Sequence, residues 1–479
     1  MRHAAGRGPS VGGVGVVIRR VAVLGGGVAG IAASVALADA GARVTLLEMT
    51  PRLGGRATSR PDPKSGGADL DNCQHVVMRC CTAILGLYDT LGVGGQIDWH
   101  DRFHFVHADG TGDTLKRGWL PAPLHLAGSF LRWRGLGWRD KVSIARTLGR
   151  MRRLSAVERG RMNDQTFGAW LSTLARAPSP GALERFWEPT VVSACNLACG
   201  SVAAGYAVQV FVDGMMAGRR GYEMGLSRVP LARLYDPAVA RIARAGGAVR
   251  FGARVKTLDL DAKTMRVRAA VLADGTRVAA DACVSALPAD ALARVLPEAA
   301  ASDPRLTRLN ELQPSPIVGL HLWLADGAGR PLAMPVPHLA LTGSRLHWLF
   351  DRGVDAEPLG RHLHAVISGA AAEADRPAAE LLDLALAEVR RVVPGAGDAV
   401  LIDGRVVVER RATFAALPGV DALRPAAACG PNGGVVNLLL AGDWTDTGWP
   451  ATMEGAARSG RAAAEAAWAR GGFTTGPAG

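Results

Sequence analysis

In "VAVLGGGVAG" (Val21–Gly30), glycines occupy positions 25, 27 and 30 directly after a short apolar run. An Ala-rich segment follows, and the strand-like "ARVTLLE" then ends at Glu48. A strand, a glycine-rich turn, a helix and a second strand within roughly thirty residues make up the βαβ unit of dinucleotide-binding domains. The sequence therefore predicts an α/β fold with a Rossmann-type nucleotide-binding domain.

Each position of this motif has a physical role. Gly25 permits the tight turn, Gly27 lets backbone amides approach a pyrophosphate, and Gly30 lets the helix pack closely on the strand. The pyrophosphate then lies at the helix N-terminus, where free N–H groups and the helix dipole favour negative charge. Glu48 ends the second strand, where its carboxylate can accept hydrogen bonds from both ribose hydroxyls. Its charge also argues against a 2′-phosphate and hence against NADP.

A second glycine pair follows in "LGGR", Leu53–Arg56. We expect Gly54 and Gly55 to bring backbone amides toward the same diphosphate, together with Arg56. The alternative is an ordinary loop with a solvated arginine, since glycine pairs mark turns in any case.

The far end of the chain carries a second nucleotide-type signal. Here "VVNLLLAGDWTDTGWPATMEGAARSG" predicts a buried strand, Val435–Leu440, a turn at Gly442 and Asp443, and then a helix with Pro450 and Thr452 near its start. Asp443 can hold a polyol hydroxyl. The helix N-terminus can face the N1–C2=O edge of a flavin, which gains negative charge on reduction.

These two ends must meet in space, so the cofactor domain is expected to be discontinuous. We assign residues 19–95, 222–300 and 405–475 to it, residues 96–221 and 301–404 to a substrate domain, and residues 1–18 to a disordered leader. An antiparallel ribbon is expected over residues 247–281, and strands of a second sheet are expected in "PSPIVGLHLWLA", "RLHWLFDR" and "LHAVISGA". "AAELLDLALAEVRRVV" has the leucine spacing of an amphipathic helix.

The composition limits the partners and the compartment. The net charge is +12 and hydrophobic residues make up 48% of the chain, but the arginines are scattered and do not form a tail. This pattern favours an anionic membrane surface over nucleic acid. The seven cysteines form no CxxC pair, so a reducing, cytoplasmic location is expected, with contact at the inner face of the membrane. The uncharged segment 190–212 is long enough to span a bilayer, yet its polar residues favour a buried helix or strand pair.

Residues 119–153 interleave Trp119, Phe130, Trp133 and Trp138 with arginine and lysine. This composition is typical of a segment that enters a lipid head-group region. The alternative is a core helix with solvated arginines.

The polar stretch "GGADLDNCQHVV" (Gly66–Val77) has three interpretations. Cys73, Cys80 and Cys81 lie close to His75, which suggests zinc, but the spacing does not fit paired ligands and we predict no metal. Asp71, Asn72, Gln74 and His75 form a catalytic cluster in the second interpretation, on an active-site strand. In the third they cap turns and satisfy buried backbone groups.

At this point the chain resembles a known group. "VAVLGGGVAG", "RLGGRA" and "LAGDWTDTGWPATMEGAARSG" resemble the flavin-dependent amine oxidase and carotenoid desaturase superfamily. "DNCQHV", "FWEPTVVSACN" and "ERRATFAALPG" look most like the hydroxysqualene dehydroxylases within it, squalene-associated desaturase-like enzymes. The similarity covers nearly the whole chain after residue 19.

The resemblance implies noncovalent FAD and a two-domain α/β architecture with an α+β substrate domain. Gly25, Gly27, Ala29 and Gly30 would meet the diphosphate, Glu48 the ribose, and Arg56 the phosphate and flavin. Val255 would contact adenine through its backbone, and Asp443 and Met453 would flank the ribitol and flavin. The implied reaction converts hydroxysqualene to squalene in hopanoid and isoprenoid biosynthesis. Asp71 or His75 would be the acid, and Asn72 and Gln74 would orient the hydroxyl.

Three alternatives stay open. The first is a carotenoid or isoprenoid desaturase working in the oxidative direction. The second is an amine oxidase, for which Trp444 and Trp449 are the candidate aromatic cage. The third is a non-catalytic isoprenoid-binding flavoprotein. The electron donor and the direction of electron flow are not legible from the residues.

Overall fold

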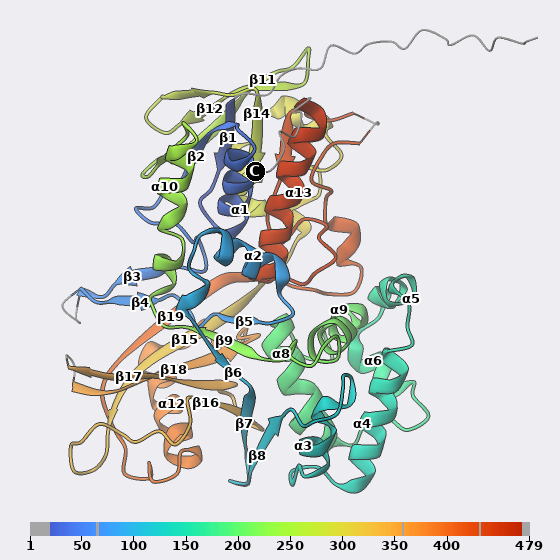
Figure 1. Cartoon of the computed structure of the whole chain (residues 1–479), viewed down its shortest axis with the longest axis vertical. Helices are drawn as coiled ribbons and strands as arrows, with labels where there is room; N and C mark the ends of the chain where they lie inside the picture. The colour runs from blue at the N-terminus through green and yellow to red at the C-terminus, as the bar shows by residue number, and fades with distance from the viewer. Residues whose placement is uncertain (1–19, 64–66, 357–358, 431–432, 472–479) are drawn as a thin grey trace, which may run out of the picture.

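The computed structural model describes residues 20–63, 67–356, 359–430 and 433–471 (Figure 1). The predicted leader, residues 1–18, lies outside the described residues.

A parallel five-stranded sheet occupies one end of the described molecule, in the order β10-β2-β1-β14-β20. Residues far apart in the sequence build it: β1 (Arg20–Leu24), β2 (Arg43–Leu47), β10 (Ala248–Arg250), β14 (Ala282–Ser285) and β20 (Leu438–Leu440). The central strands are apolar and buried on both faces, as parallel strands between two covering layers must be. The two chain ends predicted to meet are therefore neighbours through β14.

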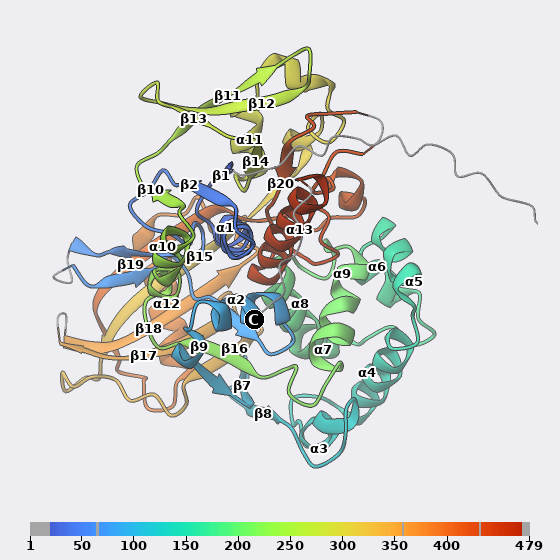
Figure 2. The same cartoon turned by 45° about the horizontal axis from the view of Figure 1, so that its top comes forward.

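Helices cover one face of this sheet and a small antiparallel sheet covers the other (Figure 2). The helices are α1 (Val28–Asp39), α10 (Pro237–Arg244) and α13 (Met453–Gly471). The small sheet is the expected ribbon: β11 (Val255–Asp261), β12 (Arg266–Leu272) and β13 (Arg277–Ala279). Alternate residues of β1 divide accordingly, since Val21 and Val23 pack toward α1, while Ala22 and Leu24 pack on the opposite face.

A second large sheet in the described part of the chain has seven strands, in the order β19-β15-β18-β17-β16-β7-β8. Its strands are β7 (Arg102–His107), β8 (Gly112–Lys116), β15 (Pro314–Ala325), β16 (His338–Thr342), β17 (Trp348–Ala356), β18 (Leu359–Ser368) and β19 (Val400–Phe414). The expected strands of a second sheet are thus confirmed, as is the amphipathic helix, α12 (Ala378–Val392), which packs on β15 and β19. The boundary predicted at residue 405 falls inside β19.

Short helices and two small sheets complete the fold. The small sheets pair β3 (Ser59–Pro61) with β4 (Asp69–Asp71), and join β5 (Val76–Met78), β9 (Met224–Ser227) and β6 (Ile97–His100). The remaining α-helices are α2 (Thr82–Thr90), α3 (Ala127–Leu131), α4 (Trp138–Met151), α5 (Ala156–Arg161), α6 (Phe167–Ser172), α7 (Pro180–Ala182), α8 (Glu188–Cys195), α9 (Ala204–Gln209) and α11 (Ala289–Val295).

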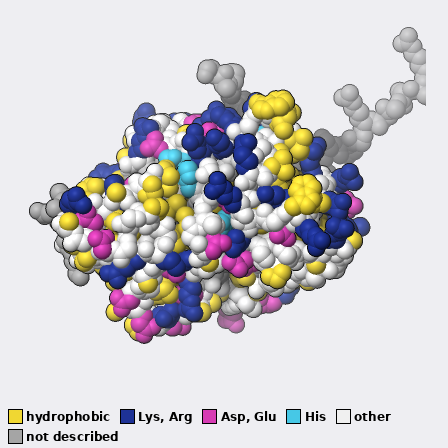
Figure 3. All heavy atoms as spheres, turned by 90° about the horizontal axis from the view of Figure 1, so that it is seen from below, with side chains coloured by type: hydrophobic (Ala, Val, Ile, Leu, Met, Phe, Trp, Pro, Cys, Tyr) yellow, Lys and Arg dark blue, Asp and Glu magenta, His cyan; other side chains and the backbone are white. Residues whose placement is uncertain are grey.

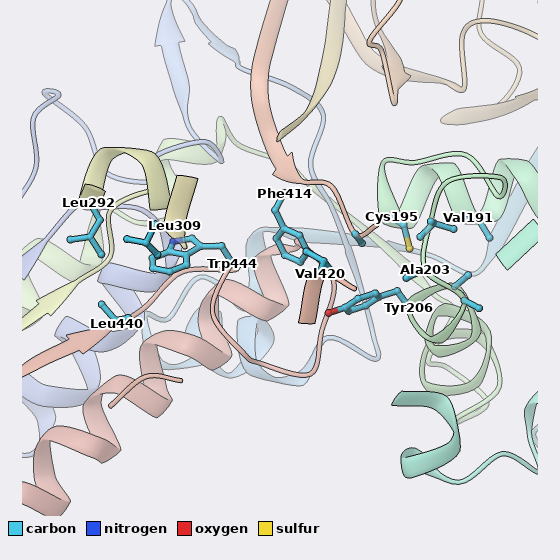
Figure 4. Packing of buried hydrophobic residues seen from close by; sticks show 14 of the residues in the cluster. Val191, Cys195, Ala203, Tyr206, Leu292, Leu309, Phe414, Val420, Leu440 and Trp444 are labelled. Atoms are coloured by element: carbon cyan, nitrogen blue, oxygen red, sulfur yellow. The ribbon is translucent and has the colours of Figure 1, made fainter. Parts of the chain in front are cut away.

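A continuous apolar core joins the parallel sheet to the helical part. Figure 4 shows it running from Leu440 and Trp444 through Phe414 to Tyr206 and Cys195. Burial of this kind contributes roughly 25 cal/mol per Å² of apolar surface. The core therefore fixes the position of the helical part relative to the parallel sheet.

Three local predictions need correction. The strand expected over Val435–Leu440 begins only at Leu438, because the Val435 amide donates to the Asp303 carboxylate and the Val436 amide to the Met265 carbonyl. The predicted active-site strand is interrupted: Asn72–His75 lies in a loop between β4 and β5. Trp133 is buried against Phe105 and Phe186, so it cannot face a membrane.

The C-terminal helix begins at Met453, later than Pro450. Thr452 caps it, since its hydroxyl accepts the Gly455 amide at 3.1 Å. Segment 190–212 is divided between α8 and α9, in line with the buried-helix alternative. Across the described ranges, no helix has both the length and the apolar character needed to cross a membrane.

Close packing of α1 on α13 generates the first prediction. A Cβ added at Gly460 would lie 2.2 Å from the Ala29 carbonyl oxygen and 2.8 Å from the Ala32 Cβ. Gly460→Ala should therefore lower the free energy of unfolding by about 1–3 kcal/mol, measured by urea denaturation. Gly149→Ala in α4 is the matched control, because nothing lies within 4 Å of the added methyl. The control should be stabilised by up to about 1 kcal/mol. Equal effects of the two changes would contradict this packing.

Candidate functional site

The glycine-rich turn leaves the N-terminus of α1 open. Gly25 has φ +98°, which favours glycine, and its amide donates to the Leu47 carbonyl. A Cβ on Gly30 would lie 1.9 Å from the Gly25 carbonyl oxygen, so position 30 must be glycine. The Ile31 amide makes a helical bond to the Gly27 carbonyl, which leaves the amides of residues 28–30, including that of Ala29, at the helix end.

The second glycine pair lies directly against the first. The Gly54 amide donates to the Gly26 carbonyl at 2.8 Å, and a Cβ on Gly55 would lie 3.0 Å from the Gly27 Cα. Gly54 and Gly55 have φ of +107° and +61°. Two backbone segments without side chains thus meet at the helix N-terminus, which suits close approach of an anionic diphosphate.

Glu48 is buried beside this turn. One carboxylate oxygen accepts the Gly26 amide at 2.7 Å, and the other accepts the Thr50 amide and hydroxyl at 2.8 Å. The Ala253 amide donates to the Glu48 carbonyl, which brings the start of β11, Val255, close to the same strand end. A carboxylate at this strand end could accept hydrogen bonds from a ribose diol, as predicted for Glu48.

Arg56 connects the two ends of the chain. Its guanidinium donates to Asp443 Oδ1 at 2.5 Å and to the Ala412 carbonyl, on β19, at 2.7 Å. Burial lowers the pKa of the Arg56 guanidinium, but the Asp443 carboxylate more than compensates and the pKa ends above its ordinary value. Arg56 is thus held in an ion pair, although 36% of its side chain is exposed, and it stays charged beside Asp443.

The loop after β20 is equally constrained. The Gly442 amide donates to the Ser459 hydroxyl at 2.8 Å, and a Cβ on Gly442, which has φ +142°, would lie 2.3 Å from the Trp444 indole nitrogen. This geometry fixes Asp443. The Met453 sulfur accepts from the hydroxyls of Tyr88 and Tyr235, both at 3.9 Å. Sequence reasoning did not find these tyrosines, because no motif surrounds them.

Together these groups fit FAD. The open helix end and the glycine backbones suit the diphosphate, and the buried Glu48 suits the ribose. Arg56, Asp443 and Met453 are the groups expected to meet the ribitol and the flavin. Backbone amides and the Arg56 guanidinium can donate to the phosphate oxygens, while the carboxylates of Glu48 and Asp443 can accept from hydroxyl groups, as recognition of such a cofactor requires.

Asp71 is committed to structural hydrogen bonds. Its Oδ1 accepts the Ser59 hydroxyl at 2.7 Å and the Leu231 amide at 2.9 Å, and Arg352 approaches Oδ2 at 3.5 Å. The carboxylate thus ties β4 to the 3₁₀ turn Leu231–Leu234 and to β17. Catalytic clusters and structural networks look alike in sequence, and for the Asp71 side chain the structure displays a network.

The loop after Asp71 holds the other three candidates. The Asn72 amide donates to the Thr58 carbonyl, and Asn72 is buried. Gln74 Oε1 is buried and has no partner among the described groups. His75 Nδ1 lies 2.9 Å from the Cys73 carbonyl, so Nδ1 carries the hydrogen and Nε2 carries the lone pair.

Charges around His75 link it to the Arg56 region. Burial lowers the pKa of His75 below its ordinary value of 6.5, and the positive charge of Arg56 acts in the same direction. Asp71 and Glu409 act in the opposite direction. Glu409, on β19, also raises the pKa of Arg56 and was not predicted from the sequence, since its strand contributes through tertiary contact.

Among the described residues, no group of three or more His, Cys, Asp or Glu side chains is placed so that it could hold a metal ion. The three cysteines near His75 do not converge on it as a ligand set, and burial raises the pKa of the Cys73 thiol to about 12. A thiol with so high a pKa is a poor metal ligand.

Comparison with known proteins identifies the chain's relatives. A family described as flavin containing amine oxidoreductase matches residues 28–467. Hydroxysqualene dehydroxylase of Rhodopseudomonas palustris is 31% identical over 95% of this chain and 99% of its own length. The 15-cis-phytoene desaturase of Synechococcus elongatus is 26% identical over 94% and 96%. Among solved structures, an oxidoreductase of Methanosarcina mazei has a TM-score of 0.68 at 17% identity, covering 93% and 100%.

The buried carboxylate generates a prediction on cofactor affinity. Glu48→Gln keeps the side-chain shape but replaces one hydrogen-bond acceptor by a donor, so the Gly26 or Thr50 amide loses its partner. FAD affinity should fall by about 5- to 150-fold, measured by titrating apoprotein with FAD. Asp39→Asn, at the exposed end of α1 where Asp39 pairs with Arg241, is the control and should bind FAD normally. Unchanged affinity in Glu48→Gln would contradict the assignment.

Proposed function

The chain belongs to the flavin-containing amine oxidoreductase family and is an FAD-dependent oxidoreductase, and from that premise we propose that it removes the hydroxyl group of hydroxysqualene to give squalene. This step would serve hopanoid and isoprenoid biosynthesis. The observation that carries the proposal is the near full-length relation to a hydroxysqualene dehydroxylase, combined with a buried polar loop close to Arg56.

The reaction replaces an allylic C–O bond by a C–H bond. Hydroxide is a poor leaving group, so an acid must protonate it as the bond breaks and water departs. Reduced FAD, when bound, supplies the hydride that the carbon receives. The remaining tasks belong to the chain: binding the isoprenoid, excluding water and delivering one proton to the hydroxyl oxygen.

We assign that proton to His75. With Nδ1 held on the Cys73 carbonyl, Nε2 takes up the proton and can present it to the substrate oxygen. The lowered pKa makes protonated His75 a stronger acid than ordinary histidine, which helps a poor leaving group depart. Asn72 and Gln74, on the same loop, would orient the hydroxyl, while Asp71 positions the loop through its network.

A desaturase working in the oxidative direction is the second candidate, because phytoene desaturases are also relatives over most of the chain. The same fold and cofactor serve both directions. The amine oxidase alternative draws less support from the structure, since Trp444 is buried and its indole donates to the Leu287 carbonyl.

We also propose that the protein works on the cytoplasmic face of an anionic membrane. The face seen in Figure 3 displays hydrophobic side chains among many lysines and arginines. Along the predicted segment, Trp119 is 85% exposed and Trp138 70% exposed, and Leu124 and Leu131 are exposed as well. Such anchors beside cations suit insertion into anionic head groups.

Only part of the predicted segment is available to contact a membrane. The apolar face of α4 is used in the core, where Ile144 and Met151 are buried, so α4 offers mainly its arginines. The apolar anchors come from the loop before α3, from α3 itself and from the start of α4. A triterpene substrate could then pass from the bilayer without crossing water.

Product identification tests the proposed reaction. The FAD-loaded protein, kept reduced without oxygen, should convert hydroxysqualene to squalene detectable by mass spectrometry. Bleaching of oxidised flavin by an added isoprenoid hydrocarbon, with no squalene from hydroxysqualene, would favour the desaturase and refute the dehydroxylase.

His75 generates a prediction on pH. Because only protonated His75 can donate, the single-turnover rate should fall as pH rises through a pKa that lies below 6.5. His75→Ala should lower the rate by about 10²- to 10⁴-fold and keep its FAD. His104→Ala, on β7, is the control and should keep the wild-type rate. A wild-type pH profile retained in His75→Ala would exclude His75 as the acid.

The exposed tryptophans generate a prediction on lipid binding. Replacing Trp119 and Trp138 together by glutamate should reduce partition into anionic vesicles at least about tenfold in flotation at low salt. Phe251→Glu, at an exposed apolar position between β10 and β11 and outside this segment, should leave flotation unchanged. Equal flotation of both variants would rule out this surface.

A further inference from the structure

Two buried histidines connect a carboxylate to the backbone of the candidate loop. Asp355 on β17 lies 3.3 Å from His362 Nδ1, and His362 Nε2 lies 2.9 Å from His321 Nδ1. His321 Nε2 in turn lies 3.0 Å from the Asp71 carbonyl oxygen, immediately before the loop Asn72–His75. Strands β15 and β18 provide the two rings, and the loop lies beyond them.

A proton count constrains this chain of contacts. Each of the three contacts joins two atoms that both carry lone pairs when deprotonated: a carboxylate oxygen, ring nitrogens or a carbonyl oxygen. Each contact therefore needs one proton, three in all. Two neutral imidazoles carry two protons between them, so all three hydrogen bonds exist together only when the cluster holds one extra proton.

The extra proton does not rest on His321. Burial, reinforced by His362, lowers the pKa of His321 to about 3, so His321 is neutral. The hydrogen bond from His362 lowers the pKa of Asp355, so this carboxylate is an ionised acceptor. Trp323 stacks on His362 with ring centroids 4.5 Å apart, and its indole donates to Asp355.

Other charges around the cluster come from every neighbouring strand. Arg352 on β17 faces both Asp355 and His321, and Arg405 on β19 lies over the Trp323 ring and pairs with Asp62. His364 packs against His321 at a tilt, with ring centroids 4.0 Å apart, and burial holds the pKa of His364 far below its ordinary value, so that ring is neutral. Asp355, with a 42% exposed side chain, is the member through which solvent can exchange the proton.

Loss of the extra proton breaks one particular contact. The carboxylate is the stronger acceptor, because a hydrogen bond to a charged oxygen is roughly twice as strong as one to a neutral carbonyl. His362 then donates to Asp355, His321 donates to His362, and His321 Nε2 is left with a lone pair facing the Asp71 carbonyl. The bond to the loop is the one that fails.

We propose that Asp355, His362 and His321 form a proton-dependent latch that positions the loop Asn72–His75. These three are positioning residues that act through the Asp71 backbone. The catalytic benefit rests on the proposed function, in which His75 on that loop gives up a proton. The latch itself rests on hydrogen-bond geometry and holds for any substrate. The latch holds the loop at low pH and releases it at high pH. Low pH is also the condition under which His75 is protonated and can donate.

Asp355→Asn tests the latch, because an asparagine amide can donate to His362 Nδ1. All three contacts are then satisfied by two neutral rings, at any pH. The FAD-loaded proteins are compared by hydrogen–deuterium exchange of a peptide covering residues 69–78, corrected for intrinsic exchange, at about pH 6 and about pH 9. Wild type should lose protection about two- to tenfold at the higher pH, whereas Asp355→Asn should retain it.

Two further variants sharpen the test. Asp351→Asn, on the same strand but paired with Arg361, should behave as wild type. His362→Phe removes the connection, so protection should be low at both pH values while bound FAD reports that the fold is intact. The same pH response in wild type and Asp355→Asn, or no loss in wild type, would overturn the latch.

The exchange measurement separates this inference from the proposed reaction. It needs no hydroxysqualene, so failed squalene formation with the expected exchange pattern would refute the dehydroxylase and leave the latch standing. Where squalene forms, loss of the latch should add to the loss of protonated His75, so the single-turnover rate of Asp355→Asn should fall less between about pH 6 and about pH 9 than that of wild type. Equal falls in the two proteins, alongside the expected exchange pattern, would refute the catalytic benefit.

Discussion

The ion pair between Arg56 and Asp443 is the interaction on which the site depends. It joins residues 387 positions apart, and Arg56 also holds the Ala412 carbonyl at the end of the long strand β19. One guanidinium therefore connects the glycine-rich end, the loop after the last parallel strand and the second sheet. Removal of Arg56 would leave the buried Asp443 carboxylate without its cation, which is more costly than the loss of a surface pair.

Backbone packing gives this ion pair its place. Gly26 and Gly27 lie against Gly54 and Gly55, and Gly460 lets α13 approach the first turn of α1. The apolar core in Figure 4 extends from Trp444 to Cys195 and keeps the helical part fixed against this arrangement. Electrostatic groups are thus held by a scaffold whose rigidity comes from close packing, so they need little reorganisation when a charged cofactor binds.

The sequence allowed much of this to be predicted, where a local rule applies. The turn at Gly25–Gly30, the buried Glu48 and the loop at Gly442 and Asp443 follow from spacing and strand ends. The other features depend on which strands pair, and in which register, once the chain has folded. Nothing local reveals that β4 ends at Asp71 with its carboxylate used by Ser59 and Leu231, or that Trp133 faces the core. The contact between His321 and His362 arises because β15 and β18 pair antiparallel, which no motif encodes.

The chain is an FAD-dependent oxidoreductase, and in the proposed function its polar loop delivers a proton to the substrate hydroxyl. A stoichiometric flavin titration tests that claim most directly. The FAD-loaded protein is reduced without oxygen, and hydroxysqualene is added while flavin absorbance and squalene are followed together. Flavin should be reoxidised as squalene forms, one squalene for each flavin. Flavin that stays reduced in the presence of excess hydroxysqualene would contradict it.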